Sequence, residues 1–356
     1  MNAIILAGDI GATKTALALY AIIDTSADRH SNVQDGLLVE QTFRNNEFSS
    51  FSEIITTFLA KQQERPSHAC FGVAGPVRAN RVQMTNLDWS MDGPALAAEF
   101  GMDEVLLVND LVATTAGAVV LPEEKLITLN TGRTDKTGSI GVLALGTGLG
   151  QAFAVPGDNQ AGNQFQPLPT EGGHVSFAPR NQEQIALLQF MLARLEQQQQ
   201  SPRQSPHVSV EQVCSGMALP TLYAFQTNRF QEPKWMEEKR LSVKPEALGP
   251  LIVEAANIAL TGGLPCEPAV RTVRLLLDIL AAEAAHLALK VLATGGIFLG
   301  GGMLPRILSH IDQEYFMRIF CRGVYMDLLA DIPVHIITEP KTALIGARQL
   351  ATKIIN

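Results

Sequence analysis

The chain has 356 residues, of which 46% are hydrophobic and 17% charged, a globular composition long enough for about two domains. A formal net charge of −8 without a basic stripe argues against nucleic acid and anionic membranes as partners. The four cysteines lie far apart and no apolar run approaches the roughly 18 residues of a membrane span, so we expect a cytoplasmic protein without a disulfide framework, a zinc site or a membrane segment.

The first predicted element is a β-hairpin at residues 4–20, where two short apolar runs flank a turn of glycine, aspartate and threonine. Such a tip is suited to phosphate, because glycines let backbone N–H groups approach an anion, Thr13 and Thr15 add hydroxyls and Lys14 adds charge. Asp9 could hold Mg²⁺ through water. The nearest alternative is a P-loop, but Thr13 stands where its second glycine belongs, and an apolar run follows where a helix would begin. From this stretch alone, an ordinary turn is equally compatible.

Strands and helices then alternate. We expect strands at 37–43, 69–74 and 104–108, and helices at 51–60 and 111–120. Asn109 and Asp110 lie between the last of these strands and the last of these helices. Ligands of α/β folds bind at the carboxyl ends of buried strands, where a helix begins. The alternative is that one of the two residues merely caps the helix, and both interpretations stay open.

A second hairpin is predicted at residues 140–155, with Gly146, Thr147 and Gly148 in its turn. Its Gly-x-Gly-x-Gly pattern is not a dinucleotide-binding fingerprint, because the third glycine comes one residue early and no helix follows. The repetition of strand, Gly/Thr turn and strand suggests a duplicated architecture in which one nucleotide lies between two hairpins.

Glu171 and His174 have the i, i+3 spacing of a metal-binding helix, but the two glycines between them make a helix improbable. A loop that presents both side chains to a polar ligand fits better. Residues 196–206 are low in complexity and predict a flexible Gln/Ser/Pro insertion. Glu211 is ambiguous alone, since Ser209 could cap a short helix with Glu211 in its first turn.

The last part of the chain predicts mainly helices. They are expected at 185–195, 248–260, 271–292 and 342–355, with strands at 295–299 and 332–337. The first of these strands ends in Gly300, Gly301 and Gly302, where a flat group could lie against the backbone.

Together these motifs are far more specific than any one of them. The set comprises Asp9-x-Gly11-x-Thr13, Asn109-Asp110, Leu145-Gly146-Thr147-Gly148-Leu149-Gly150, Glu171-Gly-Gly-His174 and Gly300-Gly301-Gly302-x-x-Pro305, with Thr85-Asn86-x-x-Trp89 and Glu211-x-Val213-x-Ser215-Gly216. In this order, over nearly the whole chain, the set resembles the bacterial glucokinases of the actin-like ATPase and sugar kinase superfamily.

The resemblance implies an α/β protein with the two-domain actin-like ATPase (ribonuclease H-like) fold and its active site in the interdomain cleft. The small domain would comprise residues 1–110 and 337–356, and the large domain residues 111–336 with the insertion at 196–206. Since family members are often dimers, the resemblance also implies a homodimer.

The activity implied is ATP-dependent phosphorylation of D-glucose at its 6-hydroxyl, giving glucose 6-phosphate and ADP and feeding glucose into glycolysis. Asp110 would be the general base. The other hydroxyls would be bound by Asn109, Glu171, His174 and Glu211. The phosphates of ATP, which brings Mg²⁺, would be held by Gly8, Asp9, Ile10, Gly11, Ala12, Thr13, Gly146, Thr147 and Gly148, and the adenosine would be bordered by Gly301, Gly302 and Pro305.

The sequence departs from the family in three respects. Ala12 replaces the second glycine of the first turn, and the insertion lengthens the spacing before Glu211, whose assignment then depends on its flanking residues. The Cys-rich zinc signature of the related ROK kinases is absent, which argues against that branch and against a structural metal. Alternatives are a kinase for another hexose or amino sugar, or a non-catalytic sugar-responsive regulator, against which the retained Asp110 argues.

Overall fold

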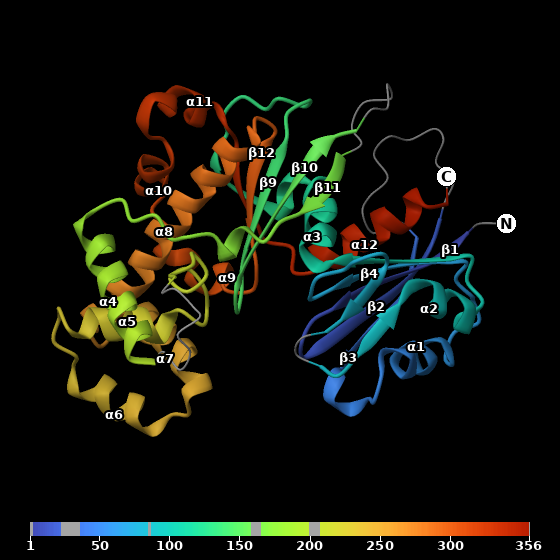
Figure 1. Cartoon of the computed structure of the whole chain (residues 1–356), viewed down its shortest axis with the longest axis horizontal. Coiled ribbons are helices and arrows are strands. Elements are labelled where there is room, and N and C mark those ends of the chain that lie inside the picture. Colours follow the sequence, from blue (N-terminus) through green and yellow to red (C-terminus); the bar gives the residue numbers. More distant parts are fainter. Residues whose placement is uncertain (1–2, 23–35, 85–86, 158–164, 199–206, 356) are drawn as a thin grey trace. The chain divides into compact units, whose positions relative to one another are not determined.

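The computed structural model of the chain describes residues 3–22, 36–84, 87–157, 165–198 and 207–355. Thr85 and Asn86 of the family motif, and residues 199–206 of the predicted insertion, lie outside the described residues. Strands and helices alternate along the chain (Figure 1), which confirms the predicted α/β class. No helix within the described ranges is long and apolar enough to cross a membrane.

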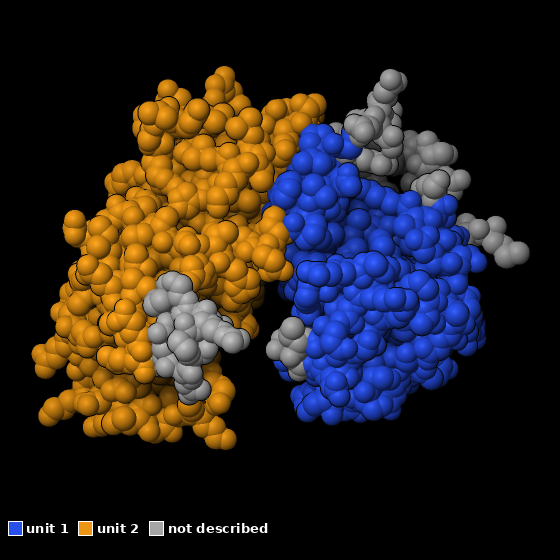
Figure 2. Space-filling model, viewed as in Figure 1, with its two compact units in different colours: residues 1–127, 152–169, 339–356 blue, residues 128–151, 170–338 orange. Residues whose placement is uncertain are grey.

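The chain divides into two compact units (Figure 2). Unit 1 comprises Met1–Ile127, Ala152–Pro169 and Glu339–Asn356, and unit 2 comprises Thr128–Gln151 and Thr170–Thr338. This division differs from the predicted domain bounds in three places, the smallest being that the last segment of unit 1 begins at Glu339 and not at residue 337. The helix that begins at Asp110 belongs to unit 1, and the chain returns to unit 1 at Ala152, within a strand.

Unit 1 is built on a five-stranded sheet in the order β3-β2-β1-β4-β7. Its strands are β1 (Ile4–Ile10), β2 (Lys14–Ala21), β3 (Leu37–Arg44), β4 (His68–Val73) and β7 (Glu104–Asn109). The first three are antiparallel to one another, whereas β1, β4 and β7 run parallel. In this register Ile10 lies opposite Val73 and Val73 opposite Asn109. The turn after β1 and the Asn109-Asp110 pair therefore lie at the same edge of the sheet.

Two pairs of helices cover the two faces of this sheet (Figure 1). Helices α1 (Phe51–Leu59) and α2 (Gly93–Phe100) cover one face, with a β-ribbon of β5 (Arg81–Gln83) and β6 (Ser90–Asp92) nearby, and α3 (Asp110–Ala118) and α12 (Thr342–Lys353) cover the other. Helix α1 forms as its pattern predicts: Ser50 caps it by accepting from Glu53 N–H, and its apolar residues face the core.

The second sheet has six strands in the order β11-β10-β9-β12-β13-β8. These are β8 (Leu126–Asn130), β9 (Ile140–Leu145), β10 (Leu149–Pro156), β11 (Phe165–Pro169), β12 (Gly296–Gly300) and β13 (Val334–Ile337). Strands β9, β12 and β13 are parallel, with Gly300 opposite Ala144. The second Gly/Thr turn and the triple glycine therefore follow neighbouring strand ends, and Met303 N–H donates to the Leu145 carbonyl at 3.0 Å.

Unit 2 is rich in helices. They are α4 (Gln182–Gln198), α5 (Leu219–Thr227), α6 (Lys234–Ser242), α7 (Pro245–Leu260), α8 (Glu267–Val291), α9 (Leu304–Ile307), α10 (Gln313–Phe320) and α11 (Met326–Asp331). Helix α8 confirms the long Ala-rich helix that the sequence predicts, and it is buried along most of its length because α5, α7 and α10 pack around it. Helices α5 and α6 were not predicted.

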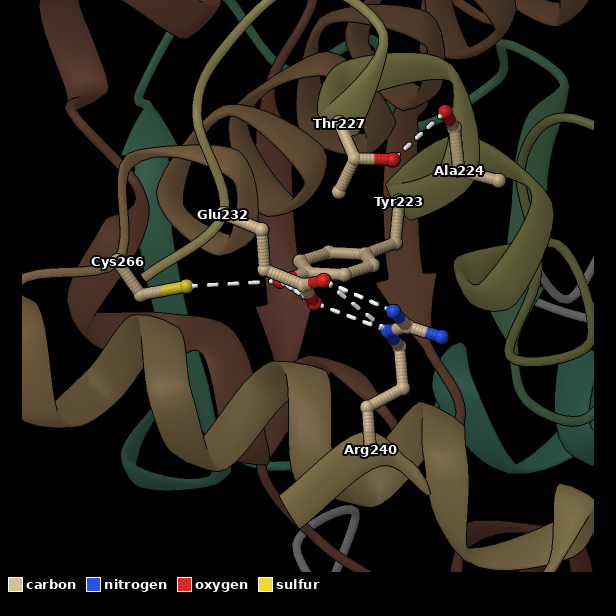
Figure 3. A network of polar contacts seen from close by, with 6 residues as sticks. All are labelled: Tyr223, Ala224, Thr227, Glu232, Arg240 and Cys266. Atoms are coloured by element: carbon tan, nitrogen blue, oxygen red, sulfur yellow. Dashed lines mark hydrogen bonds and ion pairs between the residues drawn. The ribbon is translucent and has the colours of Figure 1, made fainter. Parts of the chain in front are cut away.

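A polar network ties α5 and α6 to the start of α8 (Figure 3). Tyr223 donates to Glu232 Oε1 at 2.9 Å, and Arg240 donates to both oxygens of the same carboxylate, at 2.9 Å each from Nε and Nη2. Cys266, which precedes α8, lies 3.7 Å from the Tyr223 hydroxyl. The buried ring of Tyr223 thus joins the apolar core to a bidentate ion pair.

Candidate active site

The first turn has the geometry that the sequence predicts. Residues 11–13 join the antiparallel strands β1 and β2, and Gly11 N–H closes the turn by donating to the Lys14 carbonyl at 3.0 Å. Ala12 and Thr13 are exposed at the tip. The Thr15 hydroxyl, expected at the tip, is instead fully buried and donates to Asn45 Oδ1 at 2.8 Å. The tip therefore offers backbone groups and the exposed side chains of Thr13 and Lys14.

Asn109 and Asp110 lie at the edge of the unit 1 sheet that also carries the first turn. Asn109 caps α3, since its Oδ1 accepts from Leu111 N–H at 3.0 Å while its Nδ2 donates to the Gly75 carbonyl at 3.1 Å. Asp110 is the first residue of α3, and its Oδ1 accepts from the same Leu111 N–H at 2.9 Å. Capping, one of the two interpretations of this pair, is thus present.

Asp9, at the end of β1, is electrostatically coupled to Asp110. Burial, and secondly the charge of Asp110, raises the pKa of Asp9 to about 6. A buried carboxyl group beside a second carboxylate at a strand edge favours binding a proton or a cation.

The second turn, residues 146–148, lies in unit 2 and is hydrogen-bonded by residues of a loop distant in sequence. Gly146 N–H donates to the Gly148 carbonyl at 3.0 Å, while Gly216 N–H and Met217 N–H donate to the carbonyls of Gly146 and Thr147 at 2.9 and 3.1 Å. Glu211 Oε2 accepts from Leu149 N–H at 2.8 Å. A side chain at Gly148 would overlap this carboxylate and displace it from the turn. The structure thus places Glu211 against the second turn, which the sequence did not indicate.

Glu171 precedes a short 3₁₀ turn, Gly172–His174, and His174 is its last residue, so neither lies on an α-helix. Their side chains are 76% and 62% exposed, with Oε2 and Nε2 3.9 Å apart, so both are available to a ligand. Glu211 N–H donates to the Gly173 carbonyl at 2.9 Å. Unit 2 therefore brings Glu171, His174 and Glu211 together on two adjoining loops.

A buried polar chain supports this loop from below. Thr170 Oγ1 accepts from Gly172 N–H at 3.0 Å and donates to the Gln151 carbonyl at 3.0 Å. The buried Gln151 side chain donates to Glu283 Oε1 at 3.0 Å, and Glu283 Oε2 lies 2.8 Å from His286 Nδ1. The loop thus rests on side chains of β10 and α8.

A cavity of about 1120 Å³ opens beside the second turn, entirely within unit 2. Most of its wall is apolar, with a few polar groups, which suits a flat heterocycle. The lining includes Thr147, Met217, Pro250, Val253, Asn257, Gly302, Met303 and Arg306. Gly302 is among the residues predicted to border adenosine. The helix α7 was predicted, but its place in the cavity wall was not.

The glucokinase family model matches residues 6–354. The chain belongs to the glucokinase family. It is 34% identical over 364 residues to the glucokinase of Trichormus variabilis, covering 99% of each chain. The crystal structure of a glucokinase from an Antarctic psychrotroph matches with a TM-score of 0.80 at 27% identity, covering 99% of this chain and 100% of that one.

A more distant ROK family glucokinase from Streptomyces griseus, solved with glucose and AMPPNP, shares the fold with a TM-score of 0.59 at 19% identity, covering 98% of this chain and 99% of that one. The resemblance drawn from the motifs and the actin-like fold of sugar kinases are thereby confirmed.

Proposed function

We propose that Asp110 is the general base in the reaction of this glucokinase. The family establishes the reaction itself, ATP-dependent phosphorylation of glucose to glucose 6-phosphate. The observation that carries the proposal is the position of Asp110 at the start of α3, at the sheet edge that also bears Asp9 and the first turn. Asp110 would take the proton of the 6-hydroxyl as that oxygen attacks the γ-phosphate in line.

The sugar would be held by Asn109, Glu171, His174 and Glu211. A neutral polyol offers no charge, so several donors and acceptors in fixed geometry must hold it. The exposure of Glu171 and His174, and the bonds that join their loop to Glu211, support this assignment. Glu211 would use the oxygen that does not accept from Leu149 N–H.

ATP would place its phosphates at residues 8–13 and 146–148 and its adenosine in the cavity of unit 2, whose wall includes Gly302; Gly301 and Pro305, predicted with it, are not among the lining residues. The AMPPNP bound to the Streptomyces griseus protein supports the use of ATP. Mg²⁺ would arrive with the nucleotide, and the carboxylate of Asp9, whose charge is unfavourable beside Asp110, suits a water-mediated contact with it. We also propose a homodimer, which only the resemblance implies, and a cytoplasmic location, for which the separated cysteines and the lack of a long apolar run argue.

The first experiment is ADP release with Mg-ATP and glucose, mannose, fructose, N-acetylglucosamine or no sugar. Release of ADP that depends on glucose supports the proposal. Faster release with another sugar would make that sugar the substrate, and ATP hydrolysis without any sugar would contradict the assignment as a sugar kinase. Asp110→Ala should lower kcat by about 10²- to 10⁴-fold while glucose binding stays detectable by titration.

Because Asp110 also contacts Leu111 N–H, a matched control is needed. Asp92 caps α2 by accepting from Ala95 N–H at 3.2 Å, so Asp92→Ala removes a helix cap in the same unit. It should lower stability and leave kcat near that of the parent. Equal turnover in Asp110→Ala and Asp92→Ala would remove Asp110 from the role of base.

A further inference from the structure

A single buried asparagine holds the first turn from its inner side. Asn45 follows β3 and is 1% exposed. Its Nδ2 donates to the Gly11 carbonyl at 2.8 Å, and its backbone N–H donates to the Thr13 carbonyl at 3.0 Å. Its Oδ1 accepts from the Thr15 hydroxyl at 2.8 Å. Every atom of the Asn45 amide side chain that can form a strong hydrogen bond thus serves this one turn.

Strand register explains how Asn45 reaches the turn. Lys14 pairs with Arg44 and Thr15 with Phe43, so the residue after β3 arrives directly beneath the tip. The short 3₁₀ helix Asn45–Glu47 begins there and turns the chain toward α1. The three contacts span 30 to 34 residues of sequence, so they are tertiary contacts and not part of the hairpin itself.

The direction of these bonds decides which groups the turn presents. A turn that binds phosphate must direct N–H groups at the anion and keep carbonyl oxygens away, because their dipoles repel negative charge. Asn45 donates to two carbonyls of the turn, at Gly11 and Thr13, and so holds both oxygens on the buried side. Ala12 and Thr13 remain exposed on the other side.

We propose that Asn45 is a positioning residue of the ATP site, which fixes the first turn in its phosphate-accepting form without touching the reactants. The inference rests on the proposed function of that turn. Asparagine is specifically suited, since the site needs one donor for Gly11 and one acceptor for Thr15. An aspartate of the same shape would offer an oxygen to the Gly11 carbonyl, where two acceptors repel.

The test compares Asn45→Asp with Asn130→Asp. Asn130 lies in unit 2, and its Nδ2 likewise donates to two carbonyls, of Ala330 and Ile332, at 2.8 and 2.7 Å. Below the melting temperature of each variant, Asn45→Asp should raise the KM for Mg-ATP by about 10- to 100-fold, with the dissociation constant for glucose unchanged within about twofold. Asn130→Asp should lower the melting temperature and leave both constants unchanged.

Thr15→Val carries the test if Asn45→Asp does not fold. It keeps the shape of a fully buried side chain, removes only the donor to Asn45 Oδ1, and should raise the KM for Mg-ATP by a smaller factor. The inference is overturned if the Asn45 and Thr15 variants change the KM for Mg-ATP no more than Asn130→Asp does, or if glucose and ATP affinities fall together.

Ala12→Glu separates this inference from the proposed function. The new carboxylate would stand at the exposed tip, where it should repel phosphate and raise the KM for Mg-ATP. If Ala12→Glu raises this KM and Asn45→Asp does not, only the role of Asn45 fails. If neither raises it, the first turn is not a phosphate site and both proposals fail.

Discussion

Replacing Gly173 by alanine should displace the loop that carries Glu171 and His174. A Cβ at this position would lie well under 3.0 Å from the Leu149 carbonyl oxygen, closer than real Cβ atoms come. That oxygen is main chain at the start of β10, and Leu149 N–H is already held by Glu211, so the loop and not the strand must give way. A movement of about 1 Å in substrate-binding groups can cost on the order of 100-fold in kcat/KM.

The assay is the initial rate of glucose 6-phosphate formation against glucose at saturating Mg-ATP. Gly173→Ala should lower kcat/KM for glucose by about 100-fold, mainly through KM. A folded Gly173→Ala enzyme whose glucose kcat/KM stays within about threefold of the parent would refute the steric argument and the role of this loop in binding sugar.

Two further substitutions test the energetics of unit 2. Burial raises the pKa of Asp278 to about 6, so this carboxyl stabilises the fold fully below its unfolded pKa and loses that contribution as pH rises through about 6. Asp278→Asn should therefore raise the free energy of unfolding by about 1–3 kcal/mol at pH 8 and hardly at pH 3.5; urea curves that differ equally at both pH values would contradict this. Tyr223→Phe should lower the free energy of unfolding by about 1.5–3 kcal/mol, because the hydrogen bond to Glu232 is lost. As a control, Thr227→Ala removes a bond to the Ala224 carbonyl within α5 and should change the free energy of unfolding little.

The sequence predicts features whose cause is local. The first hairpin follows from two apolar runs around glycine, aspartate and threonine, and α1 follows from its apolar residues at helical spacing. The Glu171 loop is correctly expected not to form an α-helix, because two glycines separate its polar residues. Each of these features is determined by residues within a few positions of one another.

Features determined by distant pairs were missed. Asn45 is one asparagine between a strand and a helix, and only the register of β2 with β3 brings it to Gly11. Glu211 and Leu149 are 62 residues apart, and no local pattern indicates that the carboxylate of one holds the backbone of the other. The sequence also does not indicate where the chain passes between the two units, because one of these changes falls inside the continuous strand β10.

The two Gly/Thr turns are alike in sequence, but each is held by a different kind of side chain. The first is held by a neutral amide that bonds to the turn and is only 1% exposed, so a ligand in solvent does not reach it. The second is held by the carboxylate of Glu211, which can accept further hydrogen bonds after one oxygen has accepted from Leu149 N–H. Since Glu211 N–H also bonds to the Gly173 carbonyl, this residue joins the second turn to the loop of Glu171 and His174. A sugar bound to that loop would therefore act on the second turn through Glu211, whereas the bonds from Asn45 that hold the first turn involve no residue of the sugar loop.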